Sequence, residues 1–363
     1  RPARLARSRP ARLAVRVAGM NAQQPGPAPG ALVDRFGRVA TDLRVSLTDR
    51  CTLRCSYCMP PEGLDWLPTE QTLTDDEVVR LCRIGVERLG IRTIRFTGGE
   101  PLLRRGLETI VAAAAGMRTD RGRAPGLALT TNGLGLAHRA RGLADAGLDR
   151  VNVSLDTLDP EHYARITHRD RLPDVLAGLA AARSAGLAPV KVNAVLLRGV
   201  NDADAAQLLD FCLAEGIQLR FIEQMPIGPI DAWRRSRLVT REDILALLGA
   251  AHRLSPAPTT DPHAPARLWQ VDDDPSRTVG IIASVSDPFC GACNRTRLTA
   301  DGQIRSCLFA ISETDLRGPL RGGVDDAGIA RIWADAMLAK PAAHGLDGMD
   351  FAAPSRTMSR IGG

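Results

Sequence analysis

The sequence predicts an α/β fold, an incomplete barrel of six parallel strands that is followed by a smaller α+β extension. Strand-like runs and helical stretches alternate six times between about residues 44 and 225, which is typical of parallel strands joined by right-handed helical crossovers. Several of the helical stretches end in glycine, a common helix stop. Because a closed barrel of this kind needs eight units, we expect six units to form an open one.

The length of 363 residues suggests roughly two domains. We divide the chain into a leader and linker at 1–33, the barrel at 34–265 and a C-terminal domain at 266–363. With 44% hydrophobic and 24% charged residues, the chain is typical of a soluble globular protein. No apolar run approaches the ~18 residues that a membrane span needs, so we expect no membrane segment.

The net charge of +6 is confined to the leader, because residues 1–33 hold six arginines and no acidic residue. Residues 34–363 are therefore neutral on balance, which argues against nucleic-acid binding through a broad basic surface. Any anionic ligand would be held by a few placed cations. The leader resembles a transit peptide in composition, but the missing initial Met and the presence of Met20 favour translated upstream sequence. We expect this Pro- and Gly-rich region to be disordered and dispensable.

The expected elements follow in order. Thr74 and Glu77 form a capping box that opens the first barrel helix. Helix stops are expected at Gly90, Gly147, Gly186 and Gly216. The six expected strands begin near Arg44, Thr93, Leu127, Arg150, Val190 and Gln218.

Alternation along two of these strands indicates a polar barrel interior. In the strand from Arg150 the aliphatic residues can face the helices, and the same holds for the strand from Val190. The polar residues that then face inward are Asn152, Ser154, Asp156, Lys191 and Asn193. Such an interior suits a bound ligand better than a packed core, and ligand sites in these folds lie at the carboxyl ends of the strands.

The eight cysteines fall into two classes. Cys82 and Cys212 lie on apolar helical stripes and are expected in the core. The other six form two triplets, Cys51/Cys55/Cys58 and Cys290/Cys293/Cys307. Odd-numbered sets without a secretory signal argue against a disulfide scaffold and for a reducing compartment, which predicts a cytoplasmic protein.

The first triplet has the spacing Cys51-x3-Cys55-x2-Cys58, with Tyr57 before the last cysteine. Three thiolates could bind zinc or a structural iron-sulfur cluster, or they could hold a [4Fe-4S] cluster with one iron left open. Together with "TGGEP" at 97–101 after the second strand, this pattern resembles the radical S-adenosylmethionine (SAM) superfamily. The resemblance implies a cluster whose open iron binds SAM, and a barrel of the radical SAM type. Electron transfer to SAM then yields methionine and a 5'-deoxyadenosyl radical.

The second triplet lies around a predicted hairpin at Asp301-Gly302. A three-residue loop would pair residues 299 and 303 and place Cys307 opposite Arg295, whereas a two-residue loop would place it opposite Thr296. We favour the first register. Zinc is the alternative for the CxxC pair, but one triplet cannot complete a four-thiolate site.

Both triplets, "DLRVSLTDRC" at 42–51 and "SRIGG" at 359–363 resemble the family of GTP 3',8-cyclases over residues 36–363. The resemblance implies a lyase of molybdenum cofactor biosynthesis, with a second [4Fe-4S] cluster whose open iron contacts the guanine. The 5'-deoxyadenosyl radical would take hydrogen from ribose C3' of GTP, and C3' would then attack guanine C8. The product would be (8S)-3',8-cyclo-7,8-dihydroguanosine 5'-triphosphate.

The resemblance also implies roles for individual residues. Residues that match GTP contacts are Arg44, Arg95, Thr130, Lys191, Arg295, Thr296 and Arg297. Residues that match SAM contacts are Gly99, Ser154, Met225 and the backbone of Tyr57. Catalytic roles fall to Arg44, Gly362, Gly363 and the first cysteine triplet. One position departs from the pattern: Thr93 stands where many relatives have a phosphate-binding Lys, and Arg92 is the candidate substitute.

The implied partners are GTP, a flavodoxin- or ferredoxin-type electron donor and a downstream cyclic pyranopterin monophosphate synthase. A homodimer is left open, and neither nucleic acid nor membrane is expected. Two other functions remain: a radical SAM peptide maturase with an auxiliary cluster, and a non-catalytic metal-binding module. Peptide maturases usually carry more C-terminal cysteines, and "TGGEP" argues against the binding module.

Overall fold

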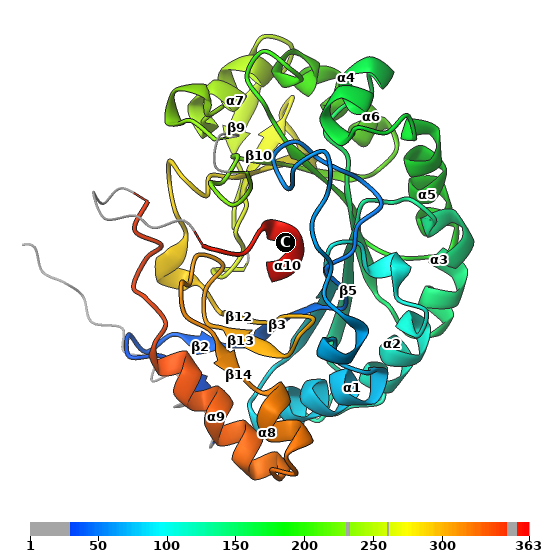
Figure 1. Ribbon diagram of the computed structural model, residues 1–363. Helices are drawn as coiled ribbons and strands as arrows, with labels where there is room; N and C mark the ends of the chain where they lie inside the picture. The colour runs from blue at the N-terminus through cyan, green and yellow to red at the C-terminus, as the bar shows by residue number, and fades with distance from the viewer. Residues whose placement is uncertain (1–29, 230–232, 260, 347–353, 363) are drawn as a thin grey trace, which may run out of the picture.

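The computed structural model describes residues 30–229, 233–259, 261–346 and 354–362. Residues 1–29 of the expected leader and the terminal Gly363 lie outside these ranges. Figure 1 shows helices ranged around a central sheet, with the C-terminal end of the chain over its middle.

The six expected strands are confirmed as parallel neighbours in chain order. Leu43, Val151 and Val192 face the helices and are buried, as period-two burial requires. The strands are β3 (Asp42–Ser46), β4 (Thr93–Thr97), β5 (Gly126–Thr131), β6 (Arg150–Ser154), β7 (Val190–Val195) and β8 (Gln218–Ile222).

Helices cover the outer face of this sheet (Figure 1). The Thr74–Glu77 capping box is present at the start of α1, and the helix passes into a π-helical turn at Ile84–Arg88 before Gly90 ends it with a φ of 76°. Cys82 and Cys212 are fully buried in the core between helices and sheet, as expected. The helices are α1 (Asp75–Arg83), α2 (Leu107–Ala115), α3 (Leu136–Asp145), α4 (Pro160–Thr167), α5 (Leu172–Ser184) and α6 (Ala205–Ala214).

The C-terminal region extends the barrel sheet at both edges. β12 pairs in parallel with β3, and β11 pairs in parallel with β8, so the sheet has twelve strands and runs from β14 to β9 without closing. The open barrel is therefore confirmed, and the expected domain boundary at residue 265 falls between β9 and β10. These strands are β9 (Leu254–Pro256), β10 (Arg267–Val271), β11 (Asp274–Ile282), β12 (Arg295–Leu298), β13 (Gln303–Arg305) and β14 (Thr314–Asp315).

The remaining elements frame the barrel. A two-stranded ribbon, β1 (Leu32–Val33) and β2 (Val39–Ala40), precedes it. Trp333 of α9 is fully buried against the sheet. The short α10 (Met358–Ile361) lies over the middle of the barrel in Figure 1. The other helices are α7 (Arg241–Gly249), α8 (Arg317–Arg321) and α9 (Asp326–Leu338).

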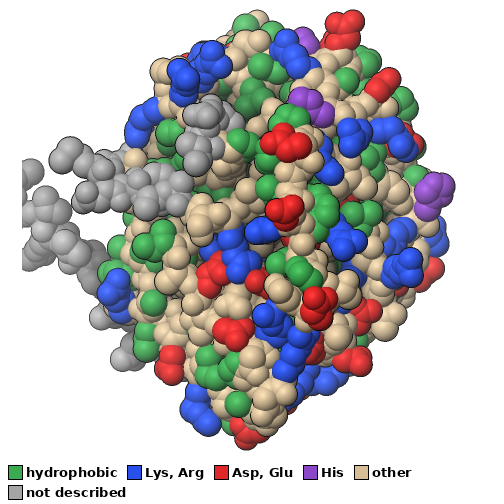
Figure 2. Space-filling model, viewed as in Figure 1, with side chains coloured by type: hydrophobic (Ala, Val, Ile, Leu, Met, Phe, Trp, Pro, Cys, Tyr) green, Lys and Arg blue, Asp and Glu red, His purple; other side chains and the backbone are tan. Residues whose placement is uncertain are grey.

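Basic and acidic side chains are interspersed over the face seen in Figure 2. This face carries no broad field of one sign, which agrees with the neutral balance of residues 34–363. None of the described helices has the length and apolar character needed to cross a membrane.

Candidate active site

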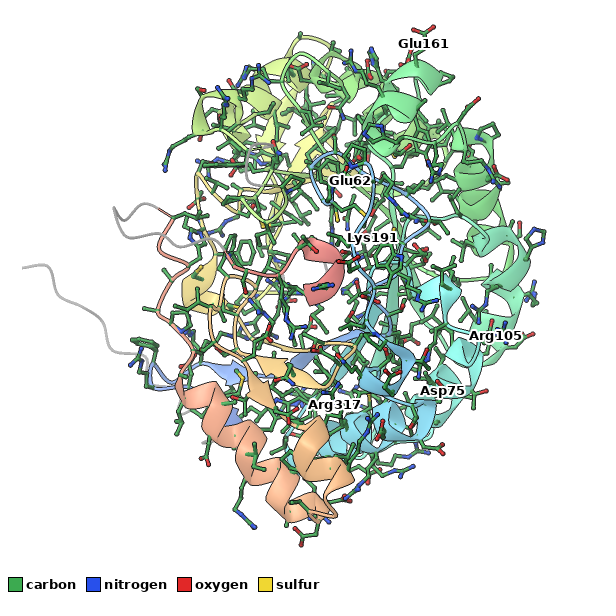
Figure 3. All side chains as sticks on the ribbon, viewed as in Figure 1. Glu62, Asp75, Arg105, Glu161, Lys191 and Arg317 are labelled. Atoms are coloured by element: carbon green, nitrogen blue, oxygen red, sulfur yellow. The ribbon has the colours of Figure 1, made fainter. Side chains whose placement is uncertain are left out.

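A cavity of about 420 Å³ lies inside the barrel. Strands β3 to β8 and β12 contribute to its wall, and the polar residues that alternation turned inward on β6 and β7, Asn152, Lys191 and Asn193, do line it. In Figure 3 Lys191 lies in the middle of the barrel, whereas Arg105 and Glu161 lie on its outer rim. The cations of the wall are Arg44, Arg95, Arg150, Lys191, Arg220, Arg295 and Arg297.

These cations are buried close to one another, which lowers the pKa of several of them. Burial and the neighbouring arginines lower the pKa of Lys191 to about 7, and the same causes lower the pKa of Arg220 to about 10. Burial, with the charge of Arg44, also lowers the pKa of Arg95. Asp42 pairs with Arg44 at 3.2 Å across the same wall. Positive charge thus exceeds negative charge in the cavity, which favours an anionic ligand.

Several polar atoms of the wall have no hydrogen-bond partner within the described residues. They include Nε and Nη1 of Arg95, Oγ1 of Thr130 and Oδ1 of Asn152 and Asn193. A buried polar atom without a partner is destabilising by about 1 to 3 kcal/mol. The pattern is therefore that of a site built for a polar ligand that supplies both donors and acceptors.

The second cysteine triplet lines this same cavity. The hairpin takes the three-residue register that we favoured: Arg297 pairs with Arg305, Thr299 N–H donates to the Gln303 carbonyl at 2.9 Å, and Gly302 has a φ of 81°. This register turns the three thiols and both β12 arginines toward one space. Burial acts to raise the pKa of Cys293, but the charges of Lys340 and Arg295 hold it below its ordinary value, which favours the thiolate.

One predicted GTP residue does not point into the cavity. The hydroxyl of Thr296 is fully buried on the opposite face of β12, where it accepts a hydrogen bond from the Trp333 indole at 3.2 Å. Strand alternation explains this, because Arg295 and Arg297 on either side of it face inward. Any contact that Thr296 makes with a ligand in the cavity would come from its backbone.

The first triplet lies in the loop after β3. Burial and the neighbouring thiols raise the pKa of Cys55, and burial together with Cys51 raises the pKa of Cys58 to about 12, so the three thiols lie close enough to repel one another as thiolates. Asn132 Nδ2 lies 3.7 Å from the Cys51 sulfur. The Asn132 backbone N–H in turn donates to Glu100 at 2.7 Å. The "TGGEP" glutamate therefore helps to position this loop through Asn132.

The two close glycines of "TGGEP" are required by packing against the same loop. A Cβ on Gly99 would lie 2.4 Å from the Asp49 carbonyl and 2.3 Å from that of Arg50, and Gly98 has a φ of 152°. Tyr57 is anchored separately, because its hydroxyl donates to Asp156 at 2.8 Å. The other residues expected to bind SAM lie around this mouth of the barrel: Ser154 ends β6, and Met225 follows β8 and lines the cavity.

The six cysteines of the two triplets form no disulfide in the structure. All eight cysteines are free thiols. Among the described residues no three His, Cys, Asp or Glu side chains converge as the ligands of one metal ion would. A [4Fe-4S] cluster takes one thiolate per iron and therefore spreads its ligands more widely.

The C-terminal tail contacts both the cavity wall and the first triplet. Arg297 Nη1 donates to the Gly362 carbonyl at 2.5 Å, and a Cβ on Gly362 would meet Ser46 at 2.9 Å and Thr97 at 3.1 Å. A hydrogen bond from the Ser359 backbone acts on the Cys58 thiol. The tail thus lies between the first triplet and the cavity. Gly363 is outside the described residues.

Sequence reasoning missed four residues of this site. Arg220 lines the cavity from β8, a strand on which polar and apolar residues alternate less regularly than on β6 and β7. Arg150 shares an inward face with Asn152, a signal that alternation did contain. Asn132 contacts the first triplet, and Lys340 donates to the Cys293 carbonyl at 3.1 Å. Nothing local in the sequence marks Lys340, because α9 ends two residues before it.

Comparison with known proteins identifies the family. Residues 45–212 match the Radical SAM superfamily, and residues 217–346 match Molybdenum Cofactor Synthesis C. A GTP 3',8-cyclase from Corynebacterium glutamicum is 59% identical over 343 residues, which cover 93% of this chain and 91% of that one. The chain belongs to the GTP 3',8-cyclase family. Its relatives of that name include those of Mycobacterium marinum, 60% identical with 93% of each chain covered, and Mycolicibacterium smegmatis, 58% identical with 95% of each covered.

The fold of this GTP 3',8-cyclase family member also resembles that of a distant solved structure. Streptococcus suis SuiB bound to S-adenosylmethionine superposes with a TM-score of 0.55 at 14% identity, over 82% of this chain and 69% of that one. Together with the match to the Radical SAM superfamily, this likeness confirms the radical SAM type of barrel that "TGGEP" and the first triplet predict.

Proposed function

We propose that this chain converts GTP to (8S)-3',8-cyclo-7,8-dihydroguanosine 5'-triphosphate in molybdenum cofactor biosynthesis. The observation that carries the proposal is the cavity, in which a cluster of cations and a second thiol triplet face each other inside a radical SAM barrel. Family membership agrees with it. The cations suit the triphosphate, and the unpartnered amide and hydroxyl oxygens suit the polar edges of a nucleoside.

A [4Fe-4S] cluster and SAM come with the radical SAM family, and the thiols that would hold the cluster are Cys51, Cys55 and Cys58. When bound, they supply the radical that takes hydrogen from ribose C3'. Cys290, Cys293 and Cys307 would hold a second [4Fe-4S] cluster, which would bind the guanine. Its position in the cavity wall supports this assignment.

The chain's own residues bind and orient the substrate. The phosphates would bind to Lys191, Arg95 and Arg220. The nucleoside would be oriented near the second triplet by Arg44, Arg295 and Arg297. Thr130 would contact GTP from β5. The tail at Gly362 would close the space between SAM and substrate, excluding water from the reacting atoms. Gly99, Ser154, Met225 and the Tyr57 backbone are proposed to hold SAM.

The finer assignments also remain proposals. We place the boundary between barrel and C-terminal domain at residue 265. We propose a reducing, cytoplasmic location, which suits thiols that would hold iron-sulfur clusters. A flavodoxin- or ferredoxin-type protein would supply the electron, and a cyclic pyranopterin monophosphate synthase would take the product. A homodimer is one oligomeric state that the proposal leaves open.

The test is turnover by protein reconstituted anaerobically with iron and sulfide, supplied with SAM, dithionite and GTP. We expect the cyclised nucleotide and 5'-deoxyadenosine in equal amounts, with little product from ATP. Cleavage of SAM that is indifferent to GTP would favour a different radical SAM substrate, such as a peptide. Failure to cleave SAM in fully loaded protein would favour a non-catalytic module.

A further inference from the structure

A basic residue lines the cavity at the start of β6, and it belongs neither to the motifs nor to the expected GTP contacts. Arg150 is the first residue of β6, Thr93 is the first of β4, and Gly126 is the first of β5 between them. Thr93 pairs with Gly126, and Arg150 pairs with Ala128. Both Arg150 and Thr93 line the cavity.

The side chain of Arg150 leans across β5 toward Thr93. A Cβ built on Gly126 would lie 3.4 Å from Arg150 Nη1, 3.8 Å from Nη2 and 3.7 Å from Thr93 Oγ1. The guanidinium and the threonine hydroxyl therefore occupy adjacent space over Gly126, which has no side chain. A longer residue at position 93 would compete with the guanidinium for that space.

Arg150 has no carboxylate partner within the described part of the chain. Its charge acts instead on other cations, since it contributes to lowering the pKa of Arg95, Lys191 and Arg220. Four cations gathered on the inner face of strands β4 and β6 to β8 repel one another unless an anion lies between them. Such a cluster is preorganised for a ligand of several negative charges.

Arg92, the candidate substitute on the opposite strand face, cannot fill this role. Its Nε and Nη2 bind both oxygens of Asp120 at 3.0 and 2.6 Å on the exposed side of the sheet. It lies next to Thr93 in the strand direction, so its side chain faces away from the cavity, and it is not among the lining residues.

We propose that Arg150, reaching over Gly126 into the space beside Thr93, is a determinant of nucleoside triphosphate binding in this chain. The inference rests on the proposed function, because it names GTP as the triphosphate. Arg150 would donate paired hydrogen bonds to phosphate oxygens, and the short Thr93 side chain leaves it room to do so.

The test compares binding of GTP and of guanosine by equilibrium dialysis to anaerobically reconstituted protein. Arg150→Ala should weaken GTP binding by about 10- to 100-fold, the usual effect of losing a charge-assisted bond, and should leave guanosine binding unchanged. Inorganic tripolyphosphate should compete with GTP less well in the variant. Arg92→Ala is the matched control and should bind GTP as the parent does.

A second variant guards against a merely structural effect. In Thr93→Lys/Arg150→Ala a cation returns to the same space from the neighbouring strand, so GTP affinity should recover by at least tenfold. Equal loss of GTP and guanosine binding, unchanged GTP binding in Arg150→Ala, or weakening in Arg92→Ala would overturn the inference. If the parent converts GTP and Arg150→Ala binds it equally well, only this inference fails. If the parent binds no GTP, the proposed function fails with it.

Discussion

Replacing Arg356 should release the C-terminal tail from the active site. Arg356 donates to both oxygens of Asp301 at 2.9 Å and lies 2.7 Å from Glu313, which fixes a residue two positions before α10 to the β12–β13 hairpin. From this anchor the chain reaches Gly362 in six residues. The anchor therefore holds the tail's tip at high effective concentration beside Arg297.

The magnitude follows from these contacts. Hydrogen bonds between charged groups contribute roughly 1.5 to 3 kcal/mol, so Arg356→Ala should lower the equilibrium constant for docking of the tail by about 10- to 100-fold. The rest of the hairpin should survive, because Asp301 keeps its bond from Thr299 at 2.6 Å and Glu313 keeps its ion pair with the buried Arg305. The melting temperature should change little.

Amide hydrogen exchange provides the assay. The Gly362 N–H bonds to the Met358 carbonyl at 2.9 Å and the Ile361 N–H to that of Thr357 at 3.1 Å, and both should lose protection by the same factor. GTP conversion should fall with protection, while SAM binding persists. Arg331→Ala, an exposed change on α9, is the matched control. Unchanged protection in Arg356→Ala would refute the anchor, and full turnover with an unprotected tail would refute the tail's role.

The remaining predictions concern metal, pH and packing. Reconstituted protein should bind about eight irons. Cys293→Ser should keep about four irons and still cleave SAM without converting GTP, whereas Cys55→Ser should lose both reactions. Zinc in the second site, measured by elemental analysis, would contradict this prediction. Because the pKa of Lys191 is about 7 in the free protein and bound phosphate must raise it, GTP binding near pH 8 should take up close to one proton. Calorimetry in buffers of different ionisation enthalpy measures this uptake, and Lys191→Ala should abolish it. Gly99→Ala should displace the cysteine loop and lower the iron content toward about four, since its Cβ would lie 2.3 Å from the Arg50 carbonyl.

Strand alternation and turn residues predicted the parts of the site that depend on contacts between residues near one another in the sequence. Alternation correctly predicted that Lys191 and Asn193 face inward, because helices cover the other face of β7. The glycine after Asp301 selected the hairpin register, because a three-residue loop needs a left-handed residue there. Arg220 was missed because polar and apolar residues alternate less regularly on β8.

Long-range pairing could not be predicted in the same way. β12 joins β3 across about 250 residues of sequence, and β11 joins β8 after an intervening helix and two strands. Nothing local specifies which edge each strand takes. The partner of Arg356, Asp301, is 55 residues away, and Thr296 was placed in the site because its neighbours belong there. These contacts depend on the packing of the whole sheet.

The most direct test of the central claim follows one hydrogen atom. GTP carrying deuterium at ribose C3' is incubated with the reconstituted enzyme, SAM and reductant, and the 5'-deoxyadenosine is analysed by mass spectrometry. The account predicts that the deuterium appears in 5'-deoxyadenosine while the cyclised nucleotide loses it. Unlabelled 5'-deoxyadenosine beside a nucleotide that keeps its deuterium would contradict hydrogen abstraction from C3', and with it the assignment of this cavity as the cyclase site.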